Sequence, residues 1–220
     1  KPFSLARSMM RANSRSQAKK NILAHYDLGN DLYQTFLDPR MQYSSAIYNS
    51  PTESLAAAQT NKLTRICEQL QLSKDDHLLE VGTGWGGLAM FAAKHYGCKV
   101  TTTTISDEQL NYAKQHVEAA DLSGQITLLD QDYRLLEGQY DKIVSVEMIE
   151  AVGKKYLPGF FKKLNNLLKP NGLMMLQAIT IADQRYQEYS RSEDFIQKHI
   201  FPGGFLPSMK LMTEIMAEKT

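Results

Sequence analysis

Residues 78–87 constrain the fold of this chain more than any other stretch. A short apolar run, broken by the acid Glu80, leads into a glycine-rich turn, and an apolar segment follows at 88–95. Glycine allows positive φ and lets a ligand approach the main chain closely. A helix after such a turn points free N–H groups and the positive end of its dipole at that ligand. The order strand, turn, helix therefore predicts a ligand-binding unit.

The glycines alone fit two cofactors. Gly82, Gly84 and Gly87 satisfy the G-x-G-x-x-G pattern of dinucleotide folds, which also place an acid about 20 residues further on. Here the next apparent strand, 98–104, ends in threonines instead. Glu80 lies just before the turn, where a carboxylate can order the turn or pair with a ligand's ammonium group. These features favour S-adenosylmethionine over a nicotinamide cofactor, with a purely structural turn as the alternative.

Composition excludes several classes of protein. The chain has 220 residues, enough for one α/β domain, and its net charge of +1 argues against a nucleic-acid-binding surface. Cys67 and Cys98 have no CxxC partner, and the five histidines show no metal-ligand spacing, so we expect no disulfide framework and no metal site. A reducing cytoplasm is the simplest setting. No apolar run approaches the length of a membrane span.

The rest of the chain alternates between strand and helix patterns. Strands are expected at 77–81, 98–104, 125–130, 141–147 and 172–181, and helices at 54–72, 88–96, 106–120 and 160–168. This alternation is typical of an α/β fold with a mostly parallel, doubly wound sheet. Ligands in such sheets bind beyond the carboxyl ends of the strands.

Residues 1–50 differ from the rest and are predicted to form a helical and aromatic lid segment, with the cofactor-binding domain at 51–220. Arg7, Arg11, Arg15 and Lys19 recur every four residues, so on a helix they form one basic stripe. Such a stripe can lie on anionic lipid headgroups or belong to a solvated lead-in. The aromatic residues of 25–48 can cover either the cofactor or the core.

Several motifs together resemble the cyclopropane-fatty-acyl-phospholipid synthase family, which includes the mycolic acid cyclopropane synthases. They are H-Y-D at 25–27, Y-S at 43–44, E-V-G-T-G-W-G-G from 80, T-I-S-D-E-Q at 104–109, D-Y-R at 132–134, V-S-V-E-M-I-E-A-V-G at 144–153 and F-P-G-G-F-L-P-S at 201–208. The resemblance implies a Rossmann-like class I methyltransferase fold with S-adenosyl-L-methionine as cofactor. The last strands of that fold have no counterpart here, so we expect a C-terminally truncated domain.

The resemblance also implies the cofactor contacts. Tyr43 and Ser44 correspond to the methionine end. Residues 78–86 correspond to the middle of the cofactor, and the ends of the next strands to its ribose and adenine. The implied set is Tyr43, Ser44, Glu80, Val81, Gly82, Gly84, Trp85, Gly86, Thr104, Ile105, Gln109, Asp132, Tyr133 and Arg134.

Family members hold a bicarbonate ion as the base that removes a proton after methyl transfer. Of its ligands, the Glu and the Ile main chain correspond to Glu150 and Ile179, but Ser45 stands where the family has Cys and Gln177 where it has His. Serine and glutamine can still donate hydrogen bonds to an anion. Glu150 is the foremost catalytic candidate, because a carboxylate facing a developing cation in a water-poor cleft is strongly stabilising. Its alternative is a surface or helix-terminal acid.

The implied activity is transfer of a one-carbon unit to unsaturated acyl chains of phospholipids, as a cyclopropane or as a methyl or methylene branch. We expect a cytoplasmic protein, peripheral to the inner membrane leaflet and attracted to its anionic surface, and we leave a homodimer open. A small-molecule N-methyltransferase and a cofactor-binding fragment without activity are the alternative functions.

Overall fold

The computed structural model describes residues 13–14, 17–18 and 29–220. The chain divides into two compact units. The sheet unit comprises residues 28–146 and 167–176, and the second unit comprises 1–27, 147–166 and 177–220. The predicted basic stripe, Arg7, Arg11, Arg15 and Lys19, and the H-Y-D motif all lie outside the described residues.

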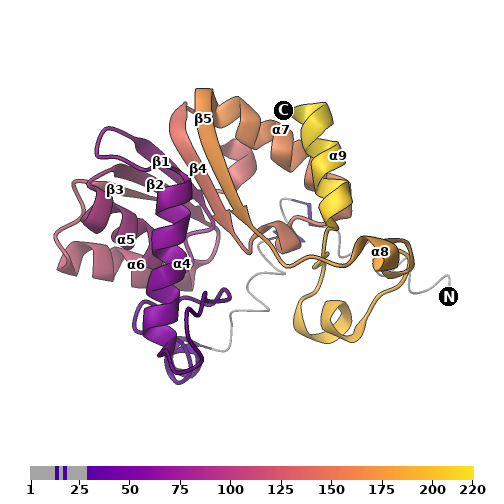
Figure 1. The fold of residues 1–220 in the computed structure, drawn as a ribbon, viewed down its shortest axis with the longest axis horizontal. Helices are drawn as coiled ribbons and strands as arrows, with labels where there is room; N and C mark the ends of the chain where they lie inside the picture. Colours follow the sequence, from indigo (N-terminus) through magenta and orange to yellow (C-terminus); the bar gives the residue numbers. More distant parts are fainter. Residues whose placement is uncertain (1–12, 15–16, 19–28) are drawn as a thin grey trace. The chain divides into compact units, whose positions relative to one another are not determined.

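The sheet unit is built on five strands in the order β3-β2-β1-β4-β5 (Figure 1). The strands are β1 His77–Val81, β2 Lys99–Thr104, β3 Ile126–Asp130, β4 Tyr140–Val146 and β5 Leu168–Gln177. β1 pairs in parallel with both β2 and β4, and β2 pairs in parallel with β3. The predicted parallel α/β sheet is therefore confirmed, and its strand order brings the carboxyl ends of β1, β2 and β3 to one edge.

Helices of the sheet unit begin where the sequence supplies a cap. Ser54 caps α4 (Leu55–Gln69) by accepting from the Ala57 N–H, and Ser106 caps α6 (Asp107–Ala119) by accepting from the Gln109 N–H. α5 (Gly87–Tyr96) follows the glycine turn directly.

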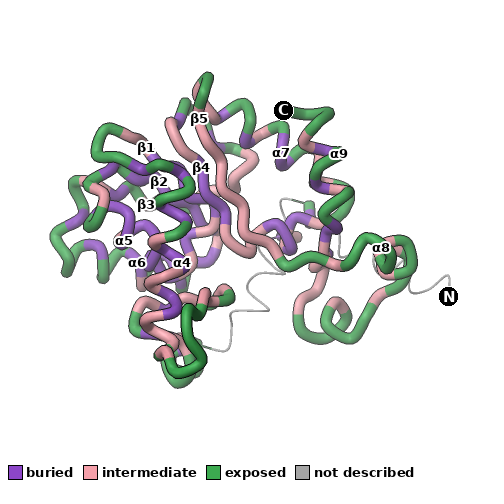
Figure 2. The backbone as a smooth tube through the Cα atoms, in the orientation of Figure 1, coloured by how far each residue is buried: buried purple, intermediate pink, exposed green. Residues whose placement is uncertain are grey.

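The core of the sheet unit lies between the strands and these helices. β1 and β2 are buried along most of their length (Figure 2), and their apolar side chains join those of α4 and α5 in one cluster. Both cysteines are free and buried there, and burial raises the pKa of Cys67 to about 12 and that of Cys98 to about 11. They act as small apolar side chains.

Residues 29–50 group with the sheet unit, so the lid boundary expected at residue 50 stays a prediction. The short helix α3 (Asn30–Gln34) brings Tyr33 against Trp85, with ring centroids 4.9 Å apart. The Trp85 indole N–H donates to the Asn30 side chain at 2.7 Å. This N-terminal segment is therefore fastened to the glycine turn.

The second unit contains α7 (Leu157–Leu167), α8 (Asp183–Tyr189), the π-helical turn η4 (Ile196–Ile200) and α9 (Met209–Lys219) (Figure 1). Its aromatic packing includes Phe205 against Tyr186 and Tyr189, at centroid distances of 6.1 and 5.7 Å. Within the ranges described, no helix is long and apolar enough to cross a bilayer.

One predicted boundary was wrong in an informative way. The sequence Pro170-Asn171-Gly172 predicted a turn before a strand at 172–181, but β5 runs from Leu168 to Gln177. Asn171 does adopt the left-handed conformation, with φ of 65°. Asparagine tolerates that conformation better than most residues. The turn-forming residues therefore lie within the bounds of the strand and do not precede it.

Candidate active site

The glycine turn has the backbone conformation that only glycine adopts easily. Gly82, Gly84 and Gly86 have φ angles of 105°, 52° and 88°. A Cβ placed at Gly84 would meet no atom within 4 Å. The turn is therefore open beside Gly84, which leaves the main chain accessible to a ligand.

Hydrogen bonds from β1 and β2 hold this turn in place. The N–H groups of Gly82 and Thr83 both donate to the Thr103 carbonyl, at 3.1 and 3.0 Å. The Thr102 hydroxyl donates to Oε2 of the Glu80 carboxyl group at 2.6 Å and lies 2.7 Å from the Thr83 hydroxyl. Because Thr102 uses its proton on Glu80, Thr83 must donate to Thr102.

Glu80 thus orders the turn, which was one of its two expected roles. Glu80 is 4% exposed. Burial raises the pKa of its carboxyl group to about 8, and the Thr102 hydrogen bond opposes that rise. The other expected role, pairing with a ligand's ammonium group, stays a prediction.

Residues 40–44 pack directly on the glycine turn. A Cβ at Gly87 would collide with Gln42 Nε2 and lie 2.5 Å from the Arg40 carbonyl oxygen, so glycine is required here by space rather than by φ. The Tyr43 ring meets the Trp85 ring edge-on at 6.4 Å. The structure therefore brings Tyr43 to the turn. Ser44, the next residue, contacts α4 instead, and the shared role of the two residues at the methionine end stays a prediction.

The ends of β2 and β3 carry the remaining predicted cofactor contacts. The Thr104 hydroxyl donates to Gln109 Oε1 at 3.3 Å and accepts from the Ser106 N–H at 3.1 Å. This bond directs the Gln109 amide so that its Nε2 is the end available to donate to a ribose hydroxyl. Ile105, which follows Thr104 in the sequence, is partly buried.

Beyond β3, the predicted adenine residues form a compact 3₁₀ turn, η1 (Tyr133–Leu135). Both oxygens of Asp132 bind the Arg134 guanidinium, at 2.8 and 2.6 Å, and the Arg134 side chain lies over the Tyr133 ring at 5.5 Å. The forked geometry of this pair is the strong form of such contacts. Asp132 therefore orients Arg134 and Tyr133 together.

The second unit holds the predicted catalytic acid. Glu150 is 6% exposed, and its Oε1 accepts from the Ile179 N–H at 2.5 Å. Its Oε2 is buried and has no hydrogen-bond partner in the described part of the chain. Burial raises the pKa of Glu150, with the Ile179 bond opposing that rise. Glu150 is thus a desolvated carboxyl group with one unused oxygen, and not a surface acid.

The neighbours of Glu150 do not fit a bicarbonate ion as they are arranged. The Gln177 amide donates to Glu147 Oε1 at 2.8 Å, and the Ile179 N–H is taken by Glu150. Two of the expected donors are therefore bound to carboxylates, whose negative charge repels an anion. Ser45 is solvent-exposed in the sheet unit. Bicarbonate binding therefore stays a prediction.

Sequence reasoning missed two polar residues on the buried face of α4, Gln59 and Lys62. Both donate hydrogen bonds to Ser44, and both are almost fully buried. They were hidden in an apolar stripe of helical spacing. The sequence did contain a signal for them: two side chains that can donate hydrogen bonds lie three residues apart on a helix stripe where apolar residues are the norm.

Comparison with known proteins gives a consistent result. Residues 13–220 match the family described as mycolic acid cyclopropane synthetase. The chain is 42% identical over 215 residues to the tuberculostearic acid methyltransferase UfaA1 of Mycobacterium tuberculosis, covering 94% of this chain and 50% of that protein. It is 43% identical over 190 residues to the cyclopropane-fatty-acyl-phospholipid synthase of Escherichia coli, covering 86% and 47%. The chain thus spans about half the length of these relatives.

Solved structures agree with the sequence relatives. The mycolic acid cyclopropane synthase CmaA1, complexed with SAH and CTAB, matches with a TM-score of 0.85 and 31% identity, covering 91% of this chain and 74% of that one. Coclaurine N-methyltransferase matches with a TM-score of 0.75 at 19% identity, covering 96% and 62%, which shows a shared fold. The class I methyltransferase fold predicted from the motifs is therefore confirmed.

Proposed function

Because this chain belongs to the mycolic acid cyclopropane synthetase family, we propose that it is an S-adenosylmethionine-dependent C-methyltransferase acting on unsaturated acyl chains of phospholipids. The observation that carries the proposal is the open glycine turn, with Tyr43 packed against Trp85 on one side and the Thr104–Gln109 pair at the neighbouring strand end. These groups offer contacts for the sulfonium amino acid and the ribose of a single extended cofactor.

The proposed chemistry begins with attack of the alkene on the sulfonium methyl group. The π electrons form the new C–C bond, the C–S bond electrons stay on sulfur, and S-adenosylhomocysteine leaves. The product is a carbocation beside the new methyl group. Loss of a proton from that methyl closes a cyclopropane ring, and loss from the neighbouring chain carbon gives a branched alkene.

Glu150 is the residue we propose to stabilise this cation. A buried carboxylate interacts with a developing positive charge far more strongly than an exposed one does. The Ile179 N–H fixes one oxygen and leaves Oε2 for that role. The catalytic roles expected for Gln177, Ile179 and Ser45 stay predictions.

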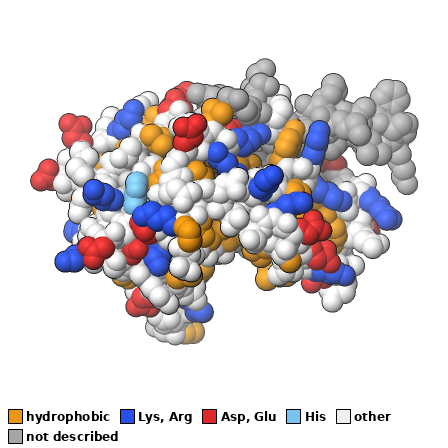
Figure 3. Space-filling view, turned by 90° about the horizontal axis from the view of Figure 1, so that it is seen from above, with side chains coloured by type: hydrophobic (Ala, Val, Ile, Leu, Met, Phe, Trp, Pro, Cys, Tyr) orange, Lys and Arg blue, Asp and Glu red, His pale blue; other side chains and the backbone are white. Residues whose placement is uncertain are grey.

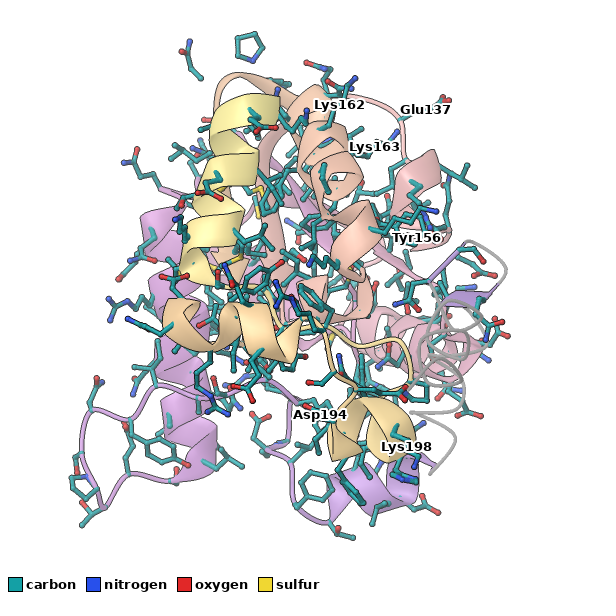
Figure 4. The ribbon with its side chains drawn as sticks, turned by 90° about the vertical axis from the view of Figure 1, so that its right-hand side faces the viewer. Glu137, Tyr156, Lys162, Lys163, Asp194 and Lys198 are labelled. Carbon is teal, nitrogen blue, oxygen red and sulfur yellow. The ribbon has the colours of Figure 1, made fainter. Side chains whose placement is uncertain are left out.

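The substrate class follows from the relatives' names and from the surface of the second unit. The names of the two relatives above contain tuberculostearic acid and fatty-acyl-phospholipid, and a sphingolipid C9-methyltransferase of Gibberella zeae is 39% identical over 199 residues, covering 86% of this chain and 38% of that protein. On the second unit, Lys162 and Lys163 lie on α7 and Lys198 on η4 (Figure 4). Phe195 and Ile196, beside Lys198, are exposed. Exposed apolar groups next to lysines suit an anionic lipid surface.

We therefore propose peripheral binding to the cytoplasmic leaflet. The face drawn in Figure 3 carries basic and acidic side chains interspersed, so the attraction would be local to the second unit and not a property of the whole surface. Flotation with vesicles of anionic and of neutral phospholipid tests this point, and sedimentation tests the homodimer left open by the sequence.

The deciding experiment is a product assay. The protein is incubated with S-adenosylmethionine and vesicles of unsaturated phospholipid, and separately with small amines, and products are measured by mass spectrometry. The proposal expects a CH₂ gain on the acyl chain, with fragmentation locating it at the former double bond. Methylation of the amines alone would identify an N-methyltransferase. Cofactor binding without any product would identify an inactive binding fragment.

A further inference from the structure

Ser44 is held at two atoms by side chains from the buried face of α4. Gln59 Nε2 donates to the Ser44 carbonyl at 2.9 Å and also to the Gln42 carbonyl at 3.2 Å. Lys62 Nζ donates to the Ser44 hydroxyl oxygen at 2.5 Å. Ser44 belongs to the segment that packs on the glycine turn through Gly87. α4 therefore sets the position of this segment from behind.

The presence of a lysine at this position calls for a functional explanation. Lys62 has 0% exposure, whereas its neighbours on the same helix stripe, Leu63 and Ile66, are apolar. Burying an ammonium group is costly unless hydrogen-bond partners compensate for the water that it loses. A leucine or methionine would fill the space without that cost, so packing alone does not account for a charge here.

The chemistry of the Lys62–Ser44 bond fixes which way the serine hydroxyl works. An ammonium group can only donate, so the Ser44 oxygen must accept, and its own proton is left to donate elsewhere. Within the described residues, no side chain or carbonyl accepts that proton. Ser44 therefore presents a donor beside a buried positive charge, and an arrangement of this kind suits a carboxylate.

The same helix face also carries an unused acceptor. Gln59 Oε1 is buried and has no hydrogen-bond partner among the residues described. The amide cannot be reversed without setting its oxygen against the carbonyls of Ser44 and Gln42. A donor, the Ser44 hydroxyl, and an acceptor, Gln59 Oε1, thus occur on the same segment and helix face. An amino acid carries the matching groups, a carboxylate that accepts and an ammonium group that donates.

We propose that Lys62 is a positioning residue that fixes the Ser44 hydroxyl as a donor to the carboxylate at the amino-acid end of S-adenosylmethionine. This inference rests on the proposed function, since it concerns the same cofactor. Lys62 does not touch the reacting methyl group; it acts through Ser44 and through its charge. Its effect is therefore on affinity for ligands that carry the carboxylate, and not on ligands that lack it.

Two ligands that differ only in this end separate the effects. S-adenosylhomocysteine carries the amino-acid group, whereas methylthioadenosine keeps the adenosine and sulfur but lacks it. Affinities of both are measured by calorimetry for the unaltered chain, Lys62→Met, Ser44→Ala and the double variant. Lys114→Met is the matched control, because Lys114 is exposed on α6 of the same unit. Circular dichroism confirms folding of each variant.

Lys62→Met is expected to weaken S-adenosylhomocysteine binding about 10- to 100-fold, the size of a lost hydrogen bond to a charged group, and to leave methylthioadenosine binding unchanged. Ser44→Ala should show the same selectivity, and the double variant should be little weaker than either single one, because both act on one contact. Lys114→Met should bind both ligands as the unaltered chain does.

Equal loss of both ligands in folded Lys62→Met, or no loss of either, overturns the inference. If Lys62→Met does not fold, Ser44→Ala decides, and unchanged S-adenosylhomocysteine affinity in that variant overturns it. Failure of the unaltered chain to bind either ligand would instead refute the proposed function, so the two failures are distinguishable.

Discussion

Replacing Glu80 by glutamine should change how the stability of the sheet unit depends on pH. Glu80 is buried beneath the glycine turn and accepts a hydrogen bond from Thr102 at 2.6 Å. Burial raises its pKa from the ordinary value of 4.5 to about 8. Glutamine keeps the shape of the side chain and an oxygen that can accept from Thr102, but it does not titrate.

The sign follows from proton binding in the two states. Between pH 4.5 and about 8 the folded chain keeps the Glu80 proton, whereas the unfolded chain has lost it. The folded state binds more protons, so raising the pH favours unfolding. The stability that belongs to the protonated group is fully present below pH 4.5 and is lost as the pH rises toward 8.

The magnitude follows from the same values. Each pH unit within that window lowers the free energy of unfolding by about 1.4 kcal/mol for a single group. Between pH 5.5 and pH 8 the contribution of Glu80 therefore falls by about 3 kcal/mol, which is a large fraction of the about 5–15 kcal/mol that stabilises a typical domain. Glu80→Gln should lack this fall.

Urea unfolding at several pH values, followed by tryptophan fluorescence, measures the effect. Trp85 is the chain's one tryptophan, is buried and lies in the turn itself, so it reports on this unit. His77, whose pKa burial lowers, and Glu150, whose pKa burial raises, titrate in both proteins and cancel in the difference.

Glu118→Gln is the control, since Glu118 is exposed on α6 and its replacement removes the same charge. If Glu80→Gln shows the same dependence on pH as the unaltered chain, the reasoning about the buried carboxyl is refuted.

Three further substitutions test the site. Gly84→Val should abolish S-adenosylhomocysteine binding in calorimetry, because φ of 52° strains a β-branched residue and its side chain would fill the open space beside the turn; full affinity would contradict this. Gly87→Ala should lower the free energy of unfolding in urea by about 1–3 kcal/mol, since its Cβ would lie against the Arg40 carbonyl; an unchanged midpoint would argue against that packing. Glu150→Gln should keep cofactor affinity but lower turnover at least about 100-fold, and unimpaired turnover would remove Glu150 from the mechanism.

The glycine turn was predictable because its requirement is local. Positive φ and the order strand, turn, helix are properties of neighbouring residues, so Gly82, Gly84 and Gly86 could be assigned from the sequence alone. The requirement at Gly87 was different. It depends on the Arg40 carbonyl, more than 40 positions earlier, and no local pattern reveals that contact.

The same distinction explains the outcome for the acids. Glu150 was found through a motif. Its bond to the Ile179 N–H and its unused oxygen were not predictable, because Ile179 lies 29 positions further along the chain and only the fold brings the two residues together. Gln177 was expected to donate to an anion. Its amide donates to Glu147, a contact that the sequence did not indicate, and donation to an anion stays a prediction. A residue type states which hydrogen bonds a side chain can make, and only the fold decides which of them it makes.

Lys62 shows what the helical pattern leaves out. A residue at an apolar position of a helical stripe is assigned to the core, and Lys62 is indeed as buried as Leu63 beside it. Yet the aliphatic stem of a lysine can occupy a core position while its ammonium group reaches a polar partner, here the Ser44 hydroxyl. A charged residue on the buried face of an amphipathic helix therefore indicates a polar partner beyond that helix. In this fold, the partner lies in the segment that covers the glycine turn.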